Sequence, residues 1–202
     1  HTVSASALAG GGTMPKPGEI SLSHNGVLFL DELPEFNRNA LEVMRQPLED
    51  REVTIARIHG KYVYPAGFML VAARNPCPCG MYPDLNKCTC SYRQIRQYNA
   101  KISRPLLDRI DINVNVQKVA YEDLLGTKKA ETSAQIRKRV LAAQKIQRER
   151  YRSESFHFNS QLDGRRTQKY IKLGSAEEAM IRDVFEETDL SARGYNRVLK
   201  IC

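Results

Sequence analysis

Two short apolar runs stand out in the pattern of hydrophobic and polar residues, and each ends directly in polar side chains. In the first, residues 26–33, four apolar residues lead directly into the carboxylates of Asp31 and Glu32. The second, residues 67–73, is followed closely by Asn75. Continuous apolar runs of this length predict strands buried on both faces, in a parallel sheet that helices cover. The polar side chains would then lie at the carboxyl edge of the sheet, where α/β proteins bind ligands.

The adjacent carboxylates fit a division of labour known from nucleotide hydrolases, in which one holds Mg²⁺ and its neighbour polarises the attacking water. On this hypothesis Asp31 serves the metal and Glu32 serves the water. Asn75 can orient the same water, because its amide hydrogen-bonds without carrying charge. The alternatives are a strand that ends in a solvated acidic turn, and an Asn-Pro pair that only starts a turn.

The segments around the first run have weaker patterns. Residues 2–8 are compatible with a short helix, the glycines and prolines of residues 10–18 predict a loop, and residues 19–24 predict a short strand or turn. After the first run, apolar residues at helical spacing predict a helix that covers the sheet and that Pro47 kinks or ends. These residues are Leu41, Met44 and Leu48.

Residues 51–64 are rich in β-branched and aromatic side chains and are interrupted at Gly60, which predicts a β-hairpin. The predicted tip carries Arg57, His59 and Lys61. Such a tip suits contact with phosphate groups, and an ordinary solvated turn accounts for the same residues equally well.

Two Cys-x-Cys pairs follow Asn75 and lie in one loop: Cys77, Cys79, Cys88 and Cys90. Four thiolates in one loop can close a tetrahedral zinc site, and reduced thiols that pack the loop are the alternative. The sequence has five cysteines, an odd number, and no export leader. This usage favours a reducing compartment over disulfides.

Residues 91–103 have apolar side chains at helical spacing, which predicts a helix with a basic face. The alternation in residues 112–116 predicts a strand. Arg109 lies between two acids just before it. Its alternatives are a surface salt bridge of little energetic weight and an arginine finger, which neutralises charge on a phosphoryl group during transfer.

The composition changes after residue 117, and the rest of the chain has helical patterns. We therefore predict two domains, 1–117 and 118–202. A capping-box pattern at Thr132 begins a helix that reaches Arg150, and further helices are predicted from Ser175 and from Leu190–Ser191. Arg193 lies near the start of the last helix, where it could face a nucleotide or remain a solvated arginine.

Charge and composition narrow the functional classes only in part. The 202 residues carry a net charge of +8, which suits polyanionic partners such as nucleic acid without distinguishing them from a well-solvated surface. No apolar stretch approaches the ~20 residues of a membrane helix. With no export leader, the sequence predicts a cytoplasmic protein without a membrane partner, and the lack of an initiating Met predicts that a segment precedes His1.

Taken together, the motifs resemble those of the Mg-chelatase-related AAA+ ATPases of the ComM/YifB kind. The resemblance covers nearly the whole chain in five ordered blocks: residues 10–36, 46–55, 73–80, 104–111 and 190–200. It implies a partial AAA+ P-loop NTPase core of the α/β class, with three layers, a mostly parallel sheet and an inserted β-hairpin, followed by an α-helical lid.

The resemblance also implies roles for individual residues. Asp31 and Glu32 match Walker B, Asn75 matches sensor 1, Arg109 matches the arginine finger and Arg193 matches sensor 2. The basic hairpin matches the pre-sensor-1 hairpin, which grips DNA in related ring helicases.

By this resemblance the full-length protein is an ATPase that binds ATP and Mg²⁺, forms a homo-hexameric ring and remodels DNA as a branch-migration helicase. The phosphate-binding pattern G-x-x-x-x-G-K-[ST] is absent from the sequence, so the chain by itself is expected to be inactive. Two alternatives remain: a magnesium-chelatase-like ATPase subunit, and a zinc-stabilised module that binds nucleic acid or protein without catalysis.

Overall fold

The computed structural model describes residues 3–58, 60–117, 119, 121, 131–188 and 190–201. Its internal contacts divide the chain into two units, His1–Ile110 and Asp111–Cys202, each described here by itself. The division into domains after residue 117 stays a prediction. None of the helices in the described residues is both long and apolar enough to cross a membrane.

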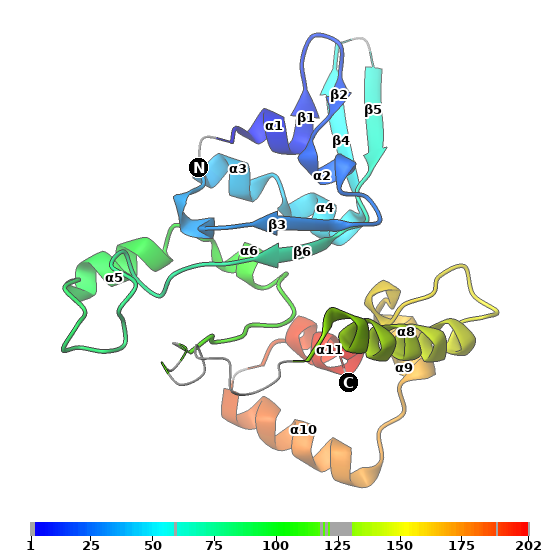
Figure 1. The fold of residues 1–202 in the computed structure, drawn as a ribbon. Helices are drawn as coiled ribbons and strands as arrows, with labels where there is room; N and C mark the ends of the chain where they lie inside the picture. The colour runs from blue at the N-terminus through cyan, green and yellow to red at the C-terminus, as the bar shows by residue number, and fades with distance from the viewer. Residues whose placement is uncertain are drawn as a thin grey trace. The chain divides into compact units, whose positions relative to one another are not determined.

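A parallel pair of strands lies at the centre of the first unit (Figure 1). Strand β3 (Val27–Leu30) pairs with β6 (Met69–Ala72), with Leu30 opposite Ala72. Both predicted strands therefore form. Their predicted burial on both faces is wrong for the described residues, because Val27 and Phe29 are each 58% exposed. Only the face that carries Leu28 and Leu30 packs against the core.

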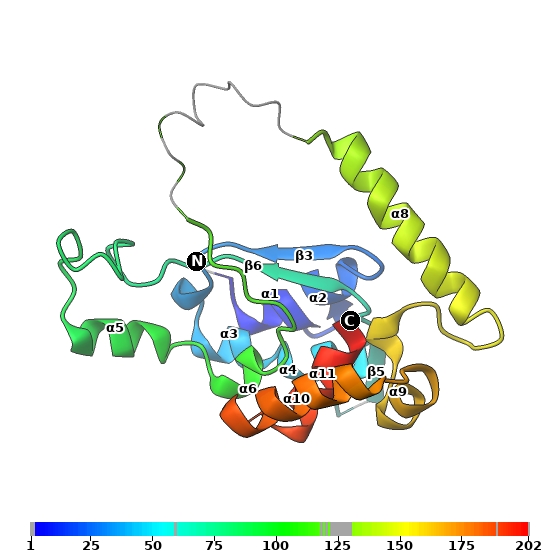
Figure 2. The same ribbon diagram turned by 90° about the horizontal axis from the view of Figure 1, so that it is seen from below.

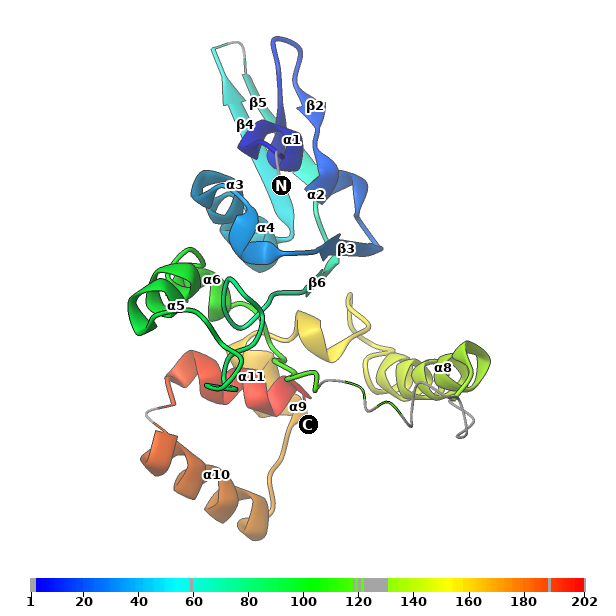
Figure 3. The ribbon, with the colours of Figure 1, turned by 60° about the vertical axis from the view of Figure 1, so that its left-hand side comes forward.

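Two antiparallel hairpins lie side by side in this unit (Figures 1 and 3). The predicted hairpin is confirmed as β4 (Glu52–Arg57) paired with β5 (Gly60–Pro65). The second consists of β1 (Gly10–Gly11) and β2 (Lys16–Pro17), where the sequence predicted only a loop.

Helices cover one side of this framework. Helix α1 (Ala5–Ala9) overlaps the predicted N-terminal helix, and α2 (Glu19–Leu22) replaces the predicted strand or turn. Gly18 stands before α2, and a Cβ at this position would lie 2.3 Å from the carbonyl oxygen of Leu8. The close backbone contact therefore requires glycine, and it turns fully buried Ile20 toward the core.

The helix predicted after the first strand forms in pieces. A 3₁₀ turn, η1 (Leu33–Glu35), is followed by α3 (Arg38–Glu42) and α4 (Arg45–Asp50). Pro47 lies in the first turn of α4 and has no N–H to donate to the preceding turn, so the break agrees with the predicted kink. Both pieces contribute to one core. Its buried members are Leu8, Ile20, Leu28, Leu30, Leu33, Ala40, Leu41, Met44, Val53, Ile55, Ala66, Ile102 and Leu106.

The predicted helix after the cysteine loop is confirmed as α5 (Tyr92–Asn99), and a short helix, α6 (Arg104–Leu107), follows it. The strand predicted at residues 112–116 is wrong. Ile112 and Val116 are 64% and 89% exposed, and this segment has no secondary structure. Alternating residues form a strand only beside a second strand, and no strand of the described residues pairs with them.

The second unit contains four α-helices and a 3₁₀ turn among its described residues: α8 (Ser133–Arg150), η2 (Asn159–Gln161), α9 (Gly164–Tyr170), α10 (Ser175–Thr188) and α11 (Ala192–Ile201). The predicted capping box of α8 is present, because Gln135 N–H donates to Thr132 Oγ1 at 3.4 Å and Thr132 N–H donates to Gln135 Oε1 at 2.8 Å. Figure 2 shows α8 as a long helix that continues into the rest of this unit at its carboxyl end.

An aromatic cluster forms the core of the second unit. Tyr151 is fully buried, its ring centroid lies 4.8 Å from that of Phe156 and 5.0 Å from that of Tyr170, and Leu162 completes the cluster. The helices α8 and α10 bury no residue themselves. Both helices form where the sequence predicted them, but their apolar side chains, among them Ile136, Val140 and Val184, are exposed within the described residues.

Candidate functional site

The parallel pairing of β3 and β6 brings the chain segments that carry Asp31, Glu32 and Asn75 to one edge of the sheet. Beyond the paired residues the ladder continues, since Ala73 N–H donates to Leu30 O and Leu33 N–H donates to Ala73 O, both at 2.9 Å. Asp31 and Glu32 therefore leave the sheet beside the segment that carries Asn75. The sequence predicted this arrangement from the carboxyl ends of parallel strands, and the catalytic roles of these residues stay predictions.

The chain turns sharply at the carboxylates. Glu32 has a φ of 51° in the left-handed region, which is uncommon for a residue with a side chain. Asp31 Oδ1 accepts a hydrogen bond from Glu32 N–H at 2.8 Å. Asp31 and Asn75 are exposed, and Glu32 is half-buried. Exposed carboxylate oxygen is the ligand type that Mg²⁺ prefers, so Asp31 fits the metal side of a nucleotide site.

The described residues supply only part of such a site. Backbone N–H groups and a lysine that cradle the phosphates belong to the G-x-x-x-x-G-K-[ST] pattern, which the sequence does not contain. The donor set at the β3–β6 edge therefore fits the metal and the water of a nucleotide hydrolase, without a phosphate cradle of that pattern in this sequence.

Helix α5 reaches the same edge through residues that the motif analysis did not single out. Arg74 Nη1 donates to Asn99 Oδ1 at 3.0 Å. Burial raises the pKa of Tyr98, and the nearby carboxylates of Glu35 and Glu32 raise it further. The helical spacing of residues 91–103 predicted a helix with an apolar stripe but not the nearness of Tyr98 to these acids.

Arg109 is engaged within the first unit. Its Nη2 lies 2.6 Å from Glu49 Oε2, and its side chain is only 11% exposed. Its Nη1 donates to Pro105 O at 2.5 Å. An arginine finger must reach the nucleotide of a neighbouring subunit, so the described conformation is that of a structural arginine, and the finger role stays a prediction.

The tip of the β4–β5 hairpin is basic as predicted, but its side chains differ in whether they contact their own chain or project into solvent. Arg57 turns back toward its own chain, because Nη1 donates to Ala56 O at 2.9 Å and Nε donates to Gly12 O at 3.4 Å. Lys61 is exposed, and the neighbouring Ile58 is 98% exposed. His59 lies outside the described residues. The predicted contact with DNA stays a prediction.

The last predicted nucleotide contact, Arg193, lies in the first turn of α11 and is exposed. Ser191 caps this helix, because Gly194 N–H donates to Ser191 Oγ at 3.1 Å. The confirmed start of the helix places Arg193 as the sequence predicted, and its role as sensor 2 stays a prediction.

The four cysteines of the loop converge. All four Sγ atoms lie within 4.8 Å of one another, and none forms a disulfide. The backbone N–H of Met81, together with the Cys77 side chain, lowers the pKa of the Cys79 thiol to about 6. For Cys88, an N–H of Cys90 acts to lower the pKa, but burial and the neighbouring thiols outweigh it and raise the pKa to about 11. Without a cation, ionisation of one thiol therefore disfavours ionisation of another.

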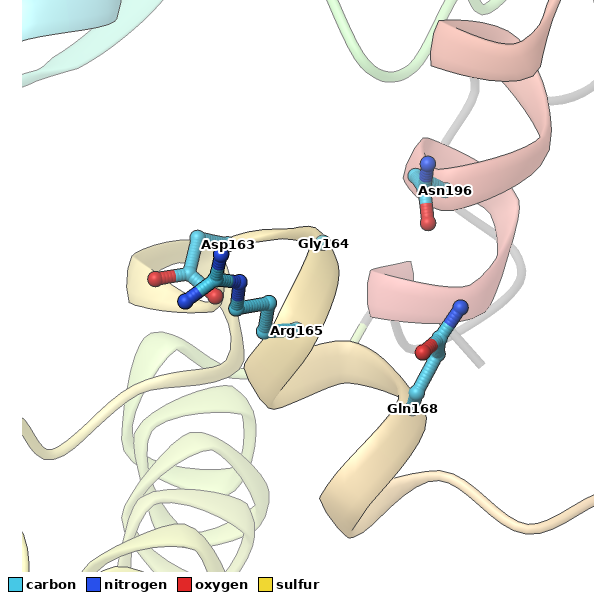
Figure 4. A pocket seen from close by; sticks show the side chains of 5 residues that line it. All are labelled: Asp163, Gly164, Arg165, Gln168 and Asn196. Carbon is cyan, nitrogen blue, oxygen red and sulfur yellow. The ribbon is translucent and has the colours of Figure 1, made fainter.

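A shallow pocket of about 550 Å³ lies in the second unit. Figure 4 shows Gln168 on α9 and Asn196 on α11 facing each other across it, with Asp163 beside Arg165. Asp163 already caps α9, because its Oδ1 accepts from Arg166 N–H at 2.8 Å. None of the predicted site residues lines this pocket, so it adds nothing to the nucleotide site.

Comparison with known proteins identifies the family of this chain. Residues 1–124 match the family model of magnesium chelatase, subunit ChlI, and residues 130–202 match that of its C-terminal part. The chain is 44% identical over its entire length to competence protein ComM of Haemophilus influenzae and covers 39% of that protein. It is 40% identical to the uncharacterized protein YifB of Salmonella typhimurium, again covering 39%.

The relatives share the whole of this chain, whereas the chain spans about two fifths of their length. The matches cover the strand ends at Asp31 and Asn75, the cysteine loop and the helical second unit alike. The chain therefore belongs to the magnesium chelatase-related AAA+ family that includes ComM and YifB.

Proposed function

We propose that this chain is the water-activating part of an ATP-hydrolysing AAA+ motor. The observation that carries the proposal is the meeting of Asp31 and Glu32 with the segment of Asn75 at the carboxyl edge of β3 and β6. Membership of the magnesium chelatase-related family supports the same reaction class.

Each side chain has a distinct task in this proposal. Bound Mg²⁺ would neutralise the charge on the phosphates of ATP. Asp31 would hold the cation, directly or through its water, and Glu32 would accept the proton of the attacking water. Asn75 orients that water through its amide. Arg109 of one subunit neutralises charge in the site of the next, and Arg193 contacts the nucleotide from the helical unit.

Replacing Glu32 by Gln in the full-length protein tests this assignment. The amide cannot accept the proton of the water, so ATP hydrolysis should be abolished while ATP binding remains. Glu35→Gln is the matched control, because Glu35 is three residues away and pairs with Lys101 at 3.3 Å. Unchanged phosphate release by the Glu32→Gln protein would overturn the proposal. The 202-residue chain alone should release no phosphate, because it lacks the phosphate cradle.

We further propose that the motor is a homo-hexameric ring that remodels DNA, as a branch-migration helicase does. The net charge of +8 and the basic hairpin support a polyanionic substrate. Lys61→Ala should weaken DNA binding and reduce the salt dependence of its affinity by about one phosphate contact, without changing basal ATP hydrolysis. Lys172→Ala makes the same charge change in the second unit and serves as control. Equal effects of the two variants would contradict the hairpin contact.

A further inference from the structure

We propose that the loop of residues 77–90 is a structural zinc site with four thiolate ligands: Cys77, Cys79, Cys88 and Cys90. The site goes beyond ATP hydrolysis and does not depend on it. It would fix the connection between the end of β6 and the start of α5.

The distances between the sulfur atoms agree with a single tetrahedral ion. Cys77 Sγ lies 3.4 Å from Cys79 Sγ and 3.8 Å from Cys88 Sγ, and Cys79 Sγ lies 3.6 Å from Cys88 Sγ. Zinc–sulfur bonds of about 2.3 Å in a tetrahedron place the sulfurs about 3.8 Å apart. A disulfide would require about 2.05 Å. The sulfurs of Cys77, Cys79 and Cys88 are therefore spaced as ligands of one ion, and Cys90 Sγ lies within 4.8 Å of each of them.

Hydrophobic packing does not account for this convergence. Cys77 is fully buried, yet it does not belong to the core of the first unit. The large apolar side chains of the loop point outward, with Met81, Tyr82 and Leu85 exposed by 49%, 39% and 80%. A short segment without a hydrophobic core is ordinarily held by a metal or by disulfides. The cysteines form no disulfide, so a metal is the remaining way to hold the loop.

Backbone turns shape each half of the loop around the sulfurs. Gly80 has a φ of +77°, its N–H donates to Cys77 O at 3.0 Å, and Tyr82 N–H approaches Cys77 Sγ at 3.5 Å. In the second half, Cys88 N–H donates to Asp84 O at 2.8 Å. An N–H directed at a ligating sulfur stabilises the thiolate and orients it, as outer hydrogen bonds do in metal sites.

The ligand set selects the metal. Four soft thiolates in a tetrahedron favour zinc or iron, and a closed set of four leaves no position for water or substrate. A cluster of several irons and sulfides needs ligands farther apart than these. We therefore assign a single zinc ion with a structural role.

The position of the loop defines what the zinc would hold. Cys77 comes two residues after Asn75, and Cys90 directly precedes Ser91, whose side chain accepts from Gln94 N–H at 3.3 Å and begins α5. At the carboxyl end of α5, Asn99 Oδ1 accepts the hydrogen bond from Arg74 Nη1. Zinc would therefore fix the cysteine loop within a closed path that runs from the end of β6 through the loop and α5 and returns to Arg74 beside β6.

Metal analysis of the full-length protein, purified without added metal, tests the site. We expect about one zinc per chain, as for a structural tetrathiolate. Cys88→Ser should remove most of it, and Cys202→Ser, which removes the one cysteine of the sequence outside the loop, should retain it. Zinc unaffected by Cys88→Ser would overturn the ligand set, and one iron per chain would overturn the choice of metal.

Two measurements on the unsubstituted protein keep the test valid if Cys88→Ser fails to fold. Replacement of the metal by Co²⁺ should produce the intense visible absorption of a tetrahedral thiolate complex. Chelation should speed amide hydrogen exchange in the cysteine loop and the first turn of α5, and should leave the β4–β5 hairpin unchanged. Metal-free protein with freely titrating thiols and exchange unaffected by chelator would refute the proposal.

Discussion

Replacing Glu49 by Gln should destabilise the first unit, because Arg109 depends on this carboxylate for charge compensation. The two side chains meet at 2.6 Å, with Arg109 11% and Glu49 40% exposed. Arg109 Nη1 has a second acceptor in Pro105 O, whereas its Nε has no hydrogen-bond partner among the described residues. The amide of the Glu49→Gln variant would keep the shape of the contact and remove its charge.

The expected loss follows from two opposing effects. Unit charges about 4 Å apart attract by about 4 kcal/mol at an effective dielectric constant of ~20, and desolvation cancels much of this. Hydrogen bonds to charged groups contribute about 1.5–3 kcal/mol. Because Glu49 is partly exposed, we expect a loss at the lower end of this range or slightly below it, about 1–2 kcal/mol. A domain of this size then melts roughly 4 °C lower for each kcal/mol.

Thermal unfolding and ATP hydrolysis of the full-length protein separate the two roles of Arg109. Glu49→Gln should lower the melting temperature and leave hydrolysis near normal, whereas Arg109→Ala should also slow hydrolysis by roughly 10³ while ATP still binds. Glu35→Gln, which breaks an exposed pair, should cost no more than about 1 kcal/mol. An unchanged melting temperature for Glu49→Gln would refute the ion-pair reasoning.

Mixing Arg109→Ala with Glu32→Gln protein tests whether the arginine acts on the neighbouring subunit. Some sites in mixed rings would then receive an intact Arg109 from one subunit and an intact Glu32 from the other. Activity should rise above that of either variant alone. Mixed rings that form without any recovery would contradict the finger role, and the structural pair with Glu49 would remain.

Three further predictions concern the second unit. Thr132→Ala removes the cap of α8 and should cost about 1 kcal/mol, visible as reduced helicity, whereas Thr132→Ser should restore it. Tyr151→Ala opens the fully buried aromatic core and should cost about 3–5 kcal/mol, so this unit should melt first in calorimetry; a single unchanged transition would contradict it. The Lys169 side chain, followed by the Tyr170 hydroxyl, lowers the pKa of Glu154. The stability that Glu154 contributes to the folded state is therefore complete above its ordinary pKa of about 4.3, and it is lost as the pH falls through the lowered pKa. Glu154→Gln should therefore flatten the decline in melting temperature below about pH 5.

Sequence patterns predicted the features that depend on nearby residues. The Thr132 capping box formed because both partners lie within one turn of the helix. The carboxyl ends of β3 and β6, which lead into Asp31 and Asn75, lie side by side because parallel strands end at the same edge of a sheet. The aromatic core around Tyr151 was missed because Phe156, Leu162 and Tyr170 lie in a polar segment without regular spacing. The signal available for α9 was Asp163, a typical capping residue.

Whether a strand face is buried depends on which element packs against it, and the periodicity of the sequence does not specify that element. The apolar run of β3 predicted two covered faces, yet the described helices cover only the face of Leu28 and Leu30. The alternation of residues 112–116 likewise predicted a strand without identifying an edge to pair with. In both cases the sequence pattern describes which side chains favour a strand or a buried face. Whether that strand or buried face forms depends on the element that packs or pairs with it.

Arg109 illustrates how a long-range partner changes the meaning of a local pattern. Its position between Asp108 and Asp111 left a surface salt bridge and an arginine finger as alternatives, whereas the structure pairs it, largely buried, with Glu49, sixty residues earlier, at 2.6 Å. Adjacent residues point in different directions, so sequence neighbours are poor partners for a long side chain. The same geometry constrains the proposed finger role, because Arg109 must exchange Glu49 for a phosphate before it can act as a finger. Because a phosphate carries more charge than one carboxylate, a nucleotide bound in a neighbouring subunit could supply the driving force for this exchange.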